Sequence, residues 1–171
     1  STLGVIGSGA LGQATAQLAN ALGMQVIFAE RIGALECRPG YVPFEEVLKR
    51  SDALTLHCPL NDHTQNLIGQ AELQQMKSNA ILINTGRGGL VNEDALVDAL
   101  KQGEIAAAGF DVFTQEPADE SNPLIANMNL PNLLLTPHVA WGSDSSIQRL
   151  AEILIENINA FERGDRVNRL V

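Results

Sequence analysis

An alternation of short apolar runs with longer helical patterns is the feature that most constrains how this chain folds. Each apolar run has the length of a strand, is continuously apolar and is bounded by Gly, Pro, Asn or Asp. Such runs are typical of parallel strands that are covered on both faces. The predicted strands are Leu3–Ile6, Met24–Ala29, Ala53–His57, Ala80–Asn84, Ile105–Phe110 and Leu133–Thr136.

Helix formers and capping residues lie between these runs. Asn92 is a good helix cap followed by two acids, and Gly103 stands where that helix would end. The predicted helices are Ala10–Leu22, Pro43–Arg50, Gln70–Met76, Asn92–Lys101 and Ser143–Arg163. Interleaved strands and helices predict an α/β fold, a doubly wound parallel sheet of about six strands with helices on both faces.

Two segments interrupt the alternation. Arg31–Val42 and Asp111–Pro131 carry few helix or strand signals, and loops above roughly 12–15 residues are usually functional or disordered. Both segments follow predicted strands, so we expect them at the carboxyl edge of the sheet, where such sheets bind ligands.

The last predicted helix carries an apolar stripe, which indicates either core packing or a docking face. The stripe consists of Ile147, Leu150, Ala151, Leu154, Ile158 and Phe161.

The composition fits one globular domain and narrows its partners. The chain has 171 residues, of which 45% are apolar, enough for one core. Eleven basic residues against 20 acids give a net charge of −9, which argues against a nucleic-acid-binding protein. No apolar run approaches the roughly 18 residues of a membrane span. Cys37 and Cys58 have neither a metal-ligand nor a C-x-x-C spacing, so we expect no metal site and a reducing, cytoplasmic location.

The segment Gly7-Ser8-Gly9-Ala10-Leu11-Gly12 spells G-x-G-x-x-G. An ordinary turn is the alternative, but this segment follows a predicted strand and opens a predicted helix, the context that dinucleotide binding requires. There Gly7 would allow the tight turn, Gly9 the approach of a pyrophosphate and Gly12 close packing of helix and strand, with Ala10 and Leu11 at the phosphate-binding helix N-terminus. The motif predicts a Rossmann-type dinucleotide-binding domain over residues 1–171.

Glu30 ends the second predicted strand, 18 residues beyond Gly12. An acid at that place accepts hydrogen bonds from the adenosine ribose of NAD and repels the 2′-phosphate of NADP. Glu30 therefore favours NAD, with NADP the less favoured cofactor. The neighbouring Arg31 is interpreted as a solvated loop cation, although a guanidinium there could also pair with a phosphate.

An arginine, a glutamate and a histidine stand just past three predicted strands. Arg87 lies in Asn84–Gly89, Glu116 in Phe110–Pro117 and His138 in Thr136–Trp141. Each of the three could instead be an ordinary surface or turn residue without a function. Three such side chains at the ligand edge of a dinucleotide-binding domain nevertheless indicate an active site.

With these segments and His57-Cys58-Pro59-Leu60, the whole chain resembles the D-isomer-specific 2-hydroxyacid dehydrogenases, with the landmarks in the family's order and spacing. The resemblance implies that Arg87 holds the substrate carboxylate, His138 donates the proton and Glu116 pairs with that histidine. A carboxylate beside His138 would favour the charged imidazolium near neutral pH, as the proton donor requires.

The resemblance also implies a set of cofactor-binding residues. Asp111 would lie near the nicotinamide, and Cys58 in a loop that faces the cofactor without a redox role. Thr64 is either a cofactor contact or a hydrogen-bonded loop residue. His57 is interpreted as a packing residue at a strand end and His63 as solvated. The implied cofactor-binding residues are Gly7, Gly9, Ala10, Leu11, Gly12, Glu30, Cys58, Thr64, Thr85, Gly86, Arg87, Asp111, His138 and Trp141.

Within the family, Thr136–Trp141 looks most like the glycerate dehydrogenases, also called hydroxypyruvate reductases. This similarity implies NAD-dependent oxidoreduction of a small D-2-hydroxy acid, with hydroxypyruvate, glyoxylate or D-glycerate as substrate. Glu30 stands where the family usually has Asp, which alters the acid but keeps its charge. The alternatives are the phosphoglycerate and D-lactate branches, and an NAD-sensing corepressor in which the domain serves as an interaction module.

The family normally has about one hundred residues ahead of the glycine motif, which form most of a substrate domain. We therefore expect the 171-residue chain to be the dinucleotide-binding domain alone, to bind NADH and to show negligible 2-oxo acid reduction. The resemblance further implies a homodimer.

Overall fold

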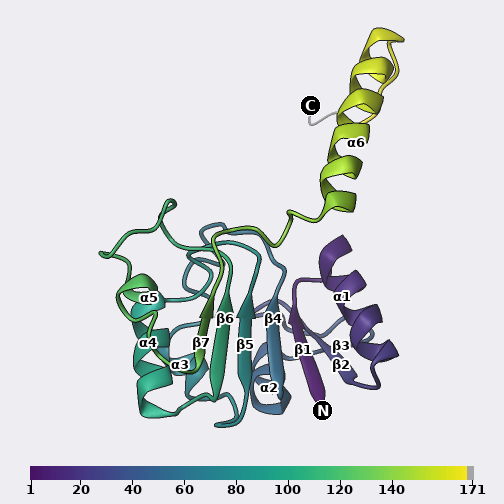
Figure 1. Ribbon diagram of the computed structural model, residues 1–171. Coiled ribbons are helices and arrows are strands. Elements are labelled where there is room, and N and C mark those ends of the chain that lie inside the picture. Colours follow the sequence, from purple (N-terminus) through teal and green to yellow (C-terminus); the bar gives the residue numbers. More distant parts are fainter. Residues whose placement is uncertain (169–171) are drawn as a thin grey trace. The chain divides into compact units, whose positions relative to one another are not determined.

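The computed structural model describes residues 1–168, which fall into two compact units. The first unit is Ser1–Pro137, and the second begins at His138. In Figure 1 the first unit is a parallel sheet with helices around it, and one long helix makes up most of the second. The first unit thus has the predicted α/β fold.

Within the described residues, seven parallel strands form one sheet in the order β3-β2-β1-β4-β5-β6-β7. They are β1 (Thr2–Ile6), β2 (Gln25–Ala29), β3 (Tyr41–Val42), β4 (Ala53–Leu56), β5 (Ile81–Asn84), β6 (Ala107–Phe110) and β7 (Leu133–Leu135). From β1 the chain first extends the sheet on one side, through β2 and β3, and then on the other side, through β4 to β7. Ligands bind doubly wound sheets at the carboxyl ends of the two strands where this order reverses, here β1 and β4.

The predicted count of about six strands is one too low, because β3 lies inside the segment Arg31–Val42 that the sequence predicts as a loop. Tyr41 and Val42 pair with Phe28 and Ala29 of β2. A two-residue strand has no periodicity of its own, and its position depends on the partner strand. Sequence patterning therefore misses it.

The described helices are α1 (Ala10–Ala21), α2 (Phe44–Arg50), α3 (Gln70–Leu73), α4 (Glu93–Gln102), α5 (Pro123–Ala126) and α6 (Asp144–Glu162). The predicted caps are confirmed for α4, where the Asn92 side chain accepts the N–H of Ala95 and Gly103 adopts a left-handed conformation. The short helix α5 falls within Asp111–Pro131, predicted as a loop. The side chain of Asn122 caps it and Pro123 occupies its first turn.

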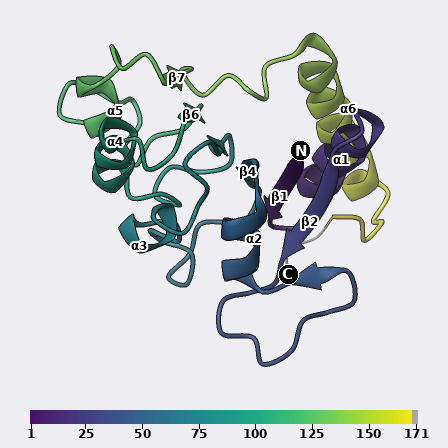
Figure 2. The same cartoon turned by 90° about the horizontal axis from the view of Figure 1, so that it is seen from below.

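Helices cover both faces of the sheet, as predicted, but not evenly. Figure 2 shows α1 on one face of the sheet and α2, α3 and α4 on the other. Leu54 and Leu56 of β4 are fully buried, whereas Ile81 of β5 is 42% exposed and Leu134 of β7 is 68% exposed. The continuous apolar run therefore indicates coverage on both faces correctly for the central strand β4, but not for Ile81 at the start of β5 or for the edge strand β7.

The second unit contains α6, whose first turn is capped by the side chain of Ser143. The predicted apolar stripe of this helix is exposed, with Leu150 at 62% and Phe161 at 78%. Among the described residues of α6, Ala160 alone is buried. The stripe therefore packs no core within its own unit, and the choice between core packing and a docking face stays a prediction.

Candidate cofactor and active site

A cleft of about 840 Å³ opens where the sheet order reverses. The glycine loop after β1, the end of β2 and the segment after β4 form its walls. The residues that line it are Ile6, Gly7, Ser8, Gly9, Ala29, Glu30, Arg31, Ile32, Arg38, Phe44, His57, Cys58, Pro59, Asn61, His63, Thr64 and Leu67. The cleft brings together Gly7 and Gly9 of the predicted glycine motif with Glu30, Cys58 and Thr64, which lie far apart in the sequence.

The glycine loop has the geometry that its motif predicts. Gly7 has φ +98°, and a Cβ there would lie 2.5 Å from the backbone nitrogen of Cys58. A Cβ on Gly12 would lie 2.0 Å from the carbonyl oxygen of Gly7, so both positions require glycine. At Gly9, by contrast, no described atom lies within 4 Å of the Cβ position. Open space at the N-terminus of α1 fits a diphosphate, since the first helical N–H groups can donate to it.

Ala10 and Leu11 form the first turn of α1, and both are exposed. Among the described residues, no acidic side chain lies in that turn and no side chain caps it. The helix terminus therefore keeps its positive potential and its N–H donors for a ligand.

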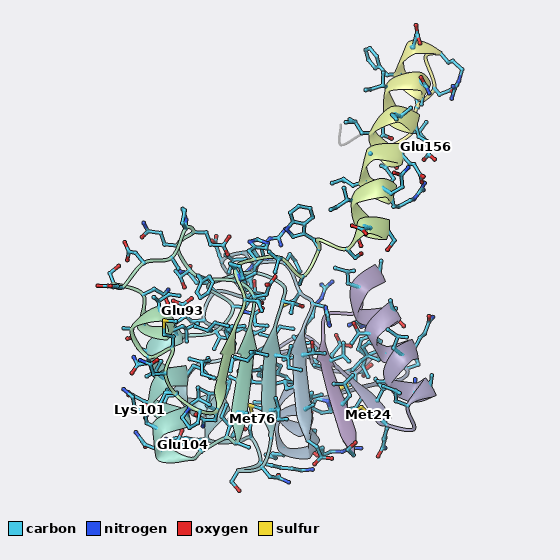
Figure 3. The ribbon with its side chains drawn as sticks, in the orientation of Figure 1. Met24, Met76, Glu93, Lys101, Glu104 and Glu156 are labelled. Carbon is cyan, nitrogen blue, oxygen red and sulfur yellow. The ribbon has the colours of Figure 1, made fainter. Side chains whose placement is uncertain are left out.

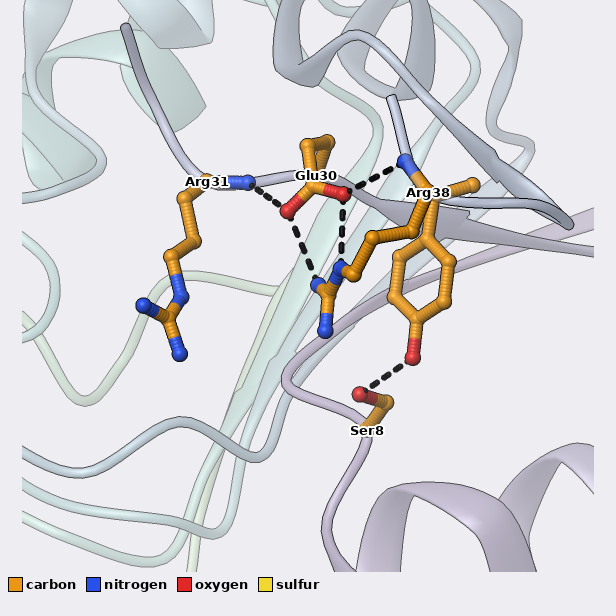
Figure 4. Close-up of polar contacts among 5 residues, drawn as sticks. Ser8, Glu30, Arg31 and Arg38 are labelled. Carbon is orange, nitrogen blue, oxygen red and sulfur yellow. Dashed lines mark hydrogen bonds and ion pairs between the residues drawn. The ribbon is translucent and has the colours of Figure 1, made fainter. Parts of the chain in front are cut away.

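Glu30 is buried at the end of β2, with its side chain 5% exposed. Its Oε1 accepts the N–H of Arg31 at 2.9 Å and Nη2–H of Arg38 at 2.8 Å. Its Oε2 accepts Nε–H of Arg38 at 2.7 Å and the backbone N–H of the same residue at 3.0 Å. Figure 4 shows this fork-to-fork geometry, with the Arg31 guanidinium pointing away from the carboxylate. The Arg38 side chain, followed by the two backbone N–H groups, lowers the pKa of Glu30 to about 2.

Arg38 is a site residue that the sequence analysis missed. Its guanidinium carbon lies 3.9 Å from the ring centroid of Tyr41, and the Tyr41 hydroxyl donates to Ser8 Oγ at 2.6 Å. A chain of contacts thus links Glu30 to the glycine loop (Figure 4). Within Arg31–Gly40 every residue is exposed, and no sequence signal pairs Arg38 with Glu30, because the contact forms only when β3 returns to β2.

The segment after β4 forms the opposite wall of the cleft. The Thr64 hydroxyl donates to the Pro59 carbonyl at 2.6 Å and accepts the N–H of Asn61 at 2.8 Å, which favours its role as a hydrogen-bonded loop residue. Burial raises the pKa of the half-buried Cys58 thiol, so this thiol stays protonated near neutral pH, consistent with the implied absence of a redox role.

Both histidines of this segment line the cleft, which the sequence analysis did not predict. His57 lies at the end of β4, half-buried, with Nε2 3.0 Å from Thr55 Oγ1. Burial lowers the pKa of His57, which keeps the imidazole neutral near pH 7. His63 is exposed, as predicted for a solvated residue.

Arg87 stands on a turn that follows β5 and is held by a buried asparagine. Asn84 Nδ2–H donates to the carbonyl of Arg87 at 2.9 Å, and Asn84 Oδ1 accepts the N–H of Gly86 at 3.1 Å. The Arg87 side chain is exposed and donates one Nη1–H to the Gly86 carbonyl at 2.7 Å. The neighbouring Thr85 is exposed as well. The turn therefore presents a guanidinium at the carboxyl edge of the sheet.

The segment after β6 carries Asp111 and Glu116. Asp111 is 2% exposed and accepts the hydroxyl of Thr136, and Glu116 Oε1 accepts the N–H of Phe113 at 3.0 Å. A Cβ on Gly88 would lie 1.8 Å from the Phe113 carbonyl oxygen. The turn that carries Arg87 and the segment that carries Glu116 therefore pack backbone against backbone.

His138 and Trp141 belong to the second unit. His138 has φ +56°, a left-handed conformation that is uncommon for residues other than glycine. The Trp141 Nε1–H donates to the His138 carbonyl at 2.9 Å, and the Gly142 N–H donates to the Val139 carbonyl at 2.9 Å. These two bonds form a compact turn ahead of α6. The Glu116–His138 pairing stays a prediction.

Residues 1–168 contain neither a metal-ligand cluster nor a helix that could cross a membrane. No group of three or more His, Cys, Asp or Glu side chains in that part of the chain is placed to hold a metal ion. No helix in the same residues has the length and apolar character to cross a membrane.

The fold and the cleft define a dinucleotide-binding domain of the doubly wound α/β class. The sequence profile of the D-isomer specific 2-hydroxyacid dehydrogenases, NAD binding domain, matches residues 1–140, and the chain belongs to this family. The predicted resemblance, fold class and NAD as cofactor are thereby confirmed.

Three known proteins illustrate the similarity. The chain is 50% identical to the glycerate dehydrogenase of Methylorubrum extorquens over 98% of this chain and 52% of that protein. It is 42% identical to the glyoxylate reductase of Korarchaeum cryptofilum over 99% of this chain and 52% of that protein. The NAD-complexed D-isomer specific 2-hydroxyacid dehydrogenase from Lactobacillus delbrueckii ssp. bulgaricus superposes with a TM-score of 0.85 at 35% identity, over 98% of this chain and 55% of that one. The chain thus spans about half the length of these relatives.

Proposed function

We propose that the protein carrying this chain is an NAD-dependent D-2-hydroxyacid dehydrogenase that acts on hydroxypyruvate, glyoxylate or D-glycerate. The observation that carries the proposal is the exposed Arg87 guanidinium on a turn fixed by buried Asn84, next along the sheet from the dinucleotide cleft. The names of the relatives, glycerate dehydrogenase and glyoxylate reductase, support the same substrate class.

Each of three side chains has one task in this proposal. Arg87 binds the substrate carboxylate through two parallel N–H···O bonds, which fixes the position of the neighbouring carbonyl. His138 donates a proton from its ring to the carbonyl oxygen, and the Glu116 carboxylate accepts a hydrogen bond from that imidazole and orients it. When bound, the reduced nicotinamide supplies the hydride that the carbonyl carbon accepts.

The remaining implied contacts concern the cofactor. The α1 N-terminus, with Gly9, Ala10 and Leu11, would hold the diphosphate, and Glu30 would face the adenosine ribose. Thr85, Gly86, Asp111 and Trp141 are proposed to line the nicotinamide end, with Arg87 and His138 beside them.

Steady-state reduction of hydroxypyruvate, glyoxylate and pyruvate by the full-length protein, with NADH and with NADPH, tests the proposal. In His138→Gln we expect kcat to fall at least about 100-fold, because the proton donor is lost, while NADH still binds. In Arg87→Gln we expect KM for the oxo acid to rise at least about tenfold, because a charged hydrogen bond is lost. Lys101→Gln is the control, since Lys101 lies in the last turn of α4 (Figure 3) and is not among the residues that line the cleft.

Normal turnover in His138→Gln would contradict the assigned proton donor. If the wild-type protein binds NADH but reduces none of the three oxo acids, that result would instead favour the alternative in which the domain serves as an NAD-sensing interaction module. The 171-residue chain alone is proposed to bind NADH without measurable turnover, and substantial turnover would contradict that proposal.

We further propose a cytoplasmic homodimer. Leu11 and Leu18 of α1 and Leu22, the residue after it, are each at least 69% exposed, and an apolar surface of this kind supports association with a second copy. The unpaired cysteines Cys37 and Cys58 suit a reducing compartment. Light scattering coupled to size exclusion tests the dimer, and a monomer mass at micromolar concentration would contradict it.

A further inference from the structure

From the Glu30–Arg38 pair we infer that Arg38 could bind the 2′-phosphate of NADP, and that Glu30 prevents this by occupying the Arg38 guanidinium. Glu30 would then select NAD through this contact as well as through charge repulsion. The inference rests on the proposed use of NAD in this cleft. It assigns to Arg38 a role in cofactor specificity.

Charge repulsion between Glu30 and a 2′-phosphate does not by itself explain a preference for NAD, because nearby arginines compensate the negative charge of Glu30. The carboxylate lies 2.7 Å from Nε and 2.8 Å from Nη2 of Arg38, and Arg31 adds a second cation to the same cleft wall. Two guanidinium groups against one carboxylate leave this edge with a net charge of +1, which would attract a phosphate. Selection against the 2′-phosphate therefore needs a second reason.

The second reason is that Glu30 occupies the Nε–Nη2 edge of the Arg38 guanidinium, one of the edges through which an arginine binds an oxyanion. Each oxygen of Glu30 accepts two N–H groups, one from the Arg38 side chain and one from the backbone. A phosphate that took over the Nε–H and Nη2–H donors of Arg38 would leave the buried Glu30 carboxylate without its counter-ion. Stripping one partner from a buried ion pair is strongly unfavourable. The Nε–Nη2 edge of Arg38 is thus unavailable to a phosphate as long as Glu30 is present.

Arg38 has the position and the access that a phosphate ligand needs. Its side chain is 49% exposed and lines the cleft together with Ser8 and Glu30. Arginine binds phosphate through the same planar fork that it here presents to the carboxylate. Glu30, the residue placed to face the adenosine ribose, therefore lies directly between this fork and the place where a 2′-phosphate would enter.

Arg38 would also keep its position without Glu30. Its guanidinium lies 3.9 Å from the centroid of the Tyr41 ring, and the Tyr41 hydroxyl donates to Ser8 of the glycine loop (Figure 4). Tyr41 itself pairs with Phe28 in the sheet. The cation–π contact is independent of the Glu30 carboxylate and holds the guanidinium beside the cleft.

A double-mutant cycle on the full-length protein separates occupation of Arg38 by Glu30 from simple charge repulsion. The Kd values for NADH and NADPH are measured by titration calorimetry in wild type, Glu30→Ala, Arg38→Ala and the double variant. If Arg38 can bind the 2′-phosphate, Glu30→Ala binds NADPH at least about tenfold more tightly than wild type, because a charged hydrogen bond is gained. The gain falls below about threefold in the double variant, and Arg38→Ala alone shows none.

An equal gain in Glu30→Ala and in the double variant would overturn the inference, because repulsion by Glu30 would then explain the preference without Arg38. Glu30→Ala/Arg38→Lys is expected to keep part of the gain, since lysine retains the charge and lacks the fork. Asp98→Asn, at an exposed position of α4, controls for the loss of one negative charge, and Lys101→Gln controls for the loss of one positive charge.

Two outcomes keep the inference distinct from the proposed function. If wild type binds neither NADH nor NADPH, the proposed cofactor is wrong; if it binds NADH and the cycle shows no coupling, the inference alone fails. Circular dichroism checks the fold of each variant. Where Glu30→Ala does not fold, Glu30→Gln with and without Arg38→Gln gives the same comparison, because glutamine keeps the shape of the side chain and removes its charge.

Discussion

The buried side chain of Asn84 bridges both ends of the turn that carries Arg87, donating to the Arg87 carbonyl at 2.9 Å and accepting from the Gly86 N–H at 3.1 Å. Asn84 is 1% exposed and ends β5. One side chain thus connects the rigid sheet to the residue proposed to bind the substrate carboxylate. The position of Arg87 depends on an amide that can both donate and accept.

Asn84→Asp tests this dependence. A carboxylate cannot donate to the Arg87 carbonyl, so the turn loses one bond and a buried acceptor loses its partner. We expect the free energy of unfolding to fall by about 1–3 kcal/mol, and KM for the oxo acid to rise more than kcat falls, because Arg87 is displaced. Asn20→Asp on the exposed side of α1 is the matched control. A KM equal to that of wild type would show that Asn84 does not position Arg87.

Gly88→Ala tests the packing of the Arg87 turn against the segment that carries Glu116. The added Cβ would lie 1.8 Å from the Phe113 carbonyl oxygen, so the two backbones must separate. We expect a loss of about 2–4 kcal/mol in the free energy of unfolding, measured by urea denaturation.

The matched control for this change is Gly109→Ala, because no described atom lies within 4 Å of the Cβ position at Gly109 in β6. There we expect a change within about 1 kcal/mol. Similar decreases in the free energy of unfolding in both variants would mean that the close approach of Gly88 to Phe113 does not cause the destabilisation.

From the Glu30–Arg38 pair we predict that part of the free energy of unfolding is lost at low pH. The pKa of Glu30 is about 2, below the ordinary value of 4.5, chiefly because the Arg38 side chain donates to the carboxylate. As the pH falls, Glu30 therefore becomes protonated at a higher pH in the unfolded state than in the folded state. The stabilisation is complete above about pH 4.5 and is lost as the pH falls toward about 2.

Arg38→Ala should remove most of that pH-dependent part. The free energy of unfolding, measured by urea denaturation from pH 7 to pH 2.5, is expected to be lower than in wild type at pH 7 and to approach it in acid. Arg31→Ala is the control, because Arg31 contributes its backbone N–H to Glu30 and keeps it in the variant. A constant difference between Arg38→Ala and wild type across this range would contradict the assigned cause of the pKa shift.

The residues that the sequence predicts correctly owe their positions to local geometry. The G-x-G-x-x-G motif is read from six consecutive residues, and Glu30 follows from the nearly fixed length of one strand–helix–strand unit. The central strands are recognised because both faces are buried, as at Leu54 and Leu56. The carboxyl-edge location of the Arg87 turn and of the segment with Glu116 follows from the parallel order of β5 and β6.

What the sequence does not predict depends on contacts between distant or irregular segments. Arg38 reaches Glu30 because β3 returns to β2, and two residues of β3 carry no readable period. The uneven coverage of the sheet, with Leu134 exposed, is a property of which helices pack on which face. Asn84 looks like a strand-ending residue in the sequence, and its bonds to Gly86 and Arg87 are visible only in three dimensions.

Differential labelling of the two cysteines provides a test of the cleft itself. Cys37 is exposed, whereas Cys58 is half-buried in the cleft wall and burial raises the pKa of its thiol. Since the thiolate is the reactive form, an aromatic disulfide reagent should modify Cys37 quickly and Cys58 slowly at pH 7.5. Saturating NADH should slow the second phase further, because a dinucleotide in the cleft covers Cys58, and leave the first unchanged. Cys37→Ser should abolish the fast phase and Cys58→Ser the phase that NADH protects. A slow phase that is indifferent to NADH would place the cofactor away from the segment after β4 and overturn the assignment of this cleft.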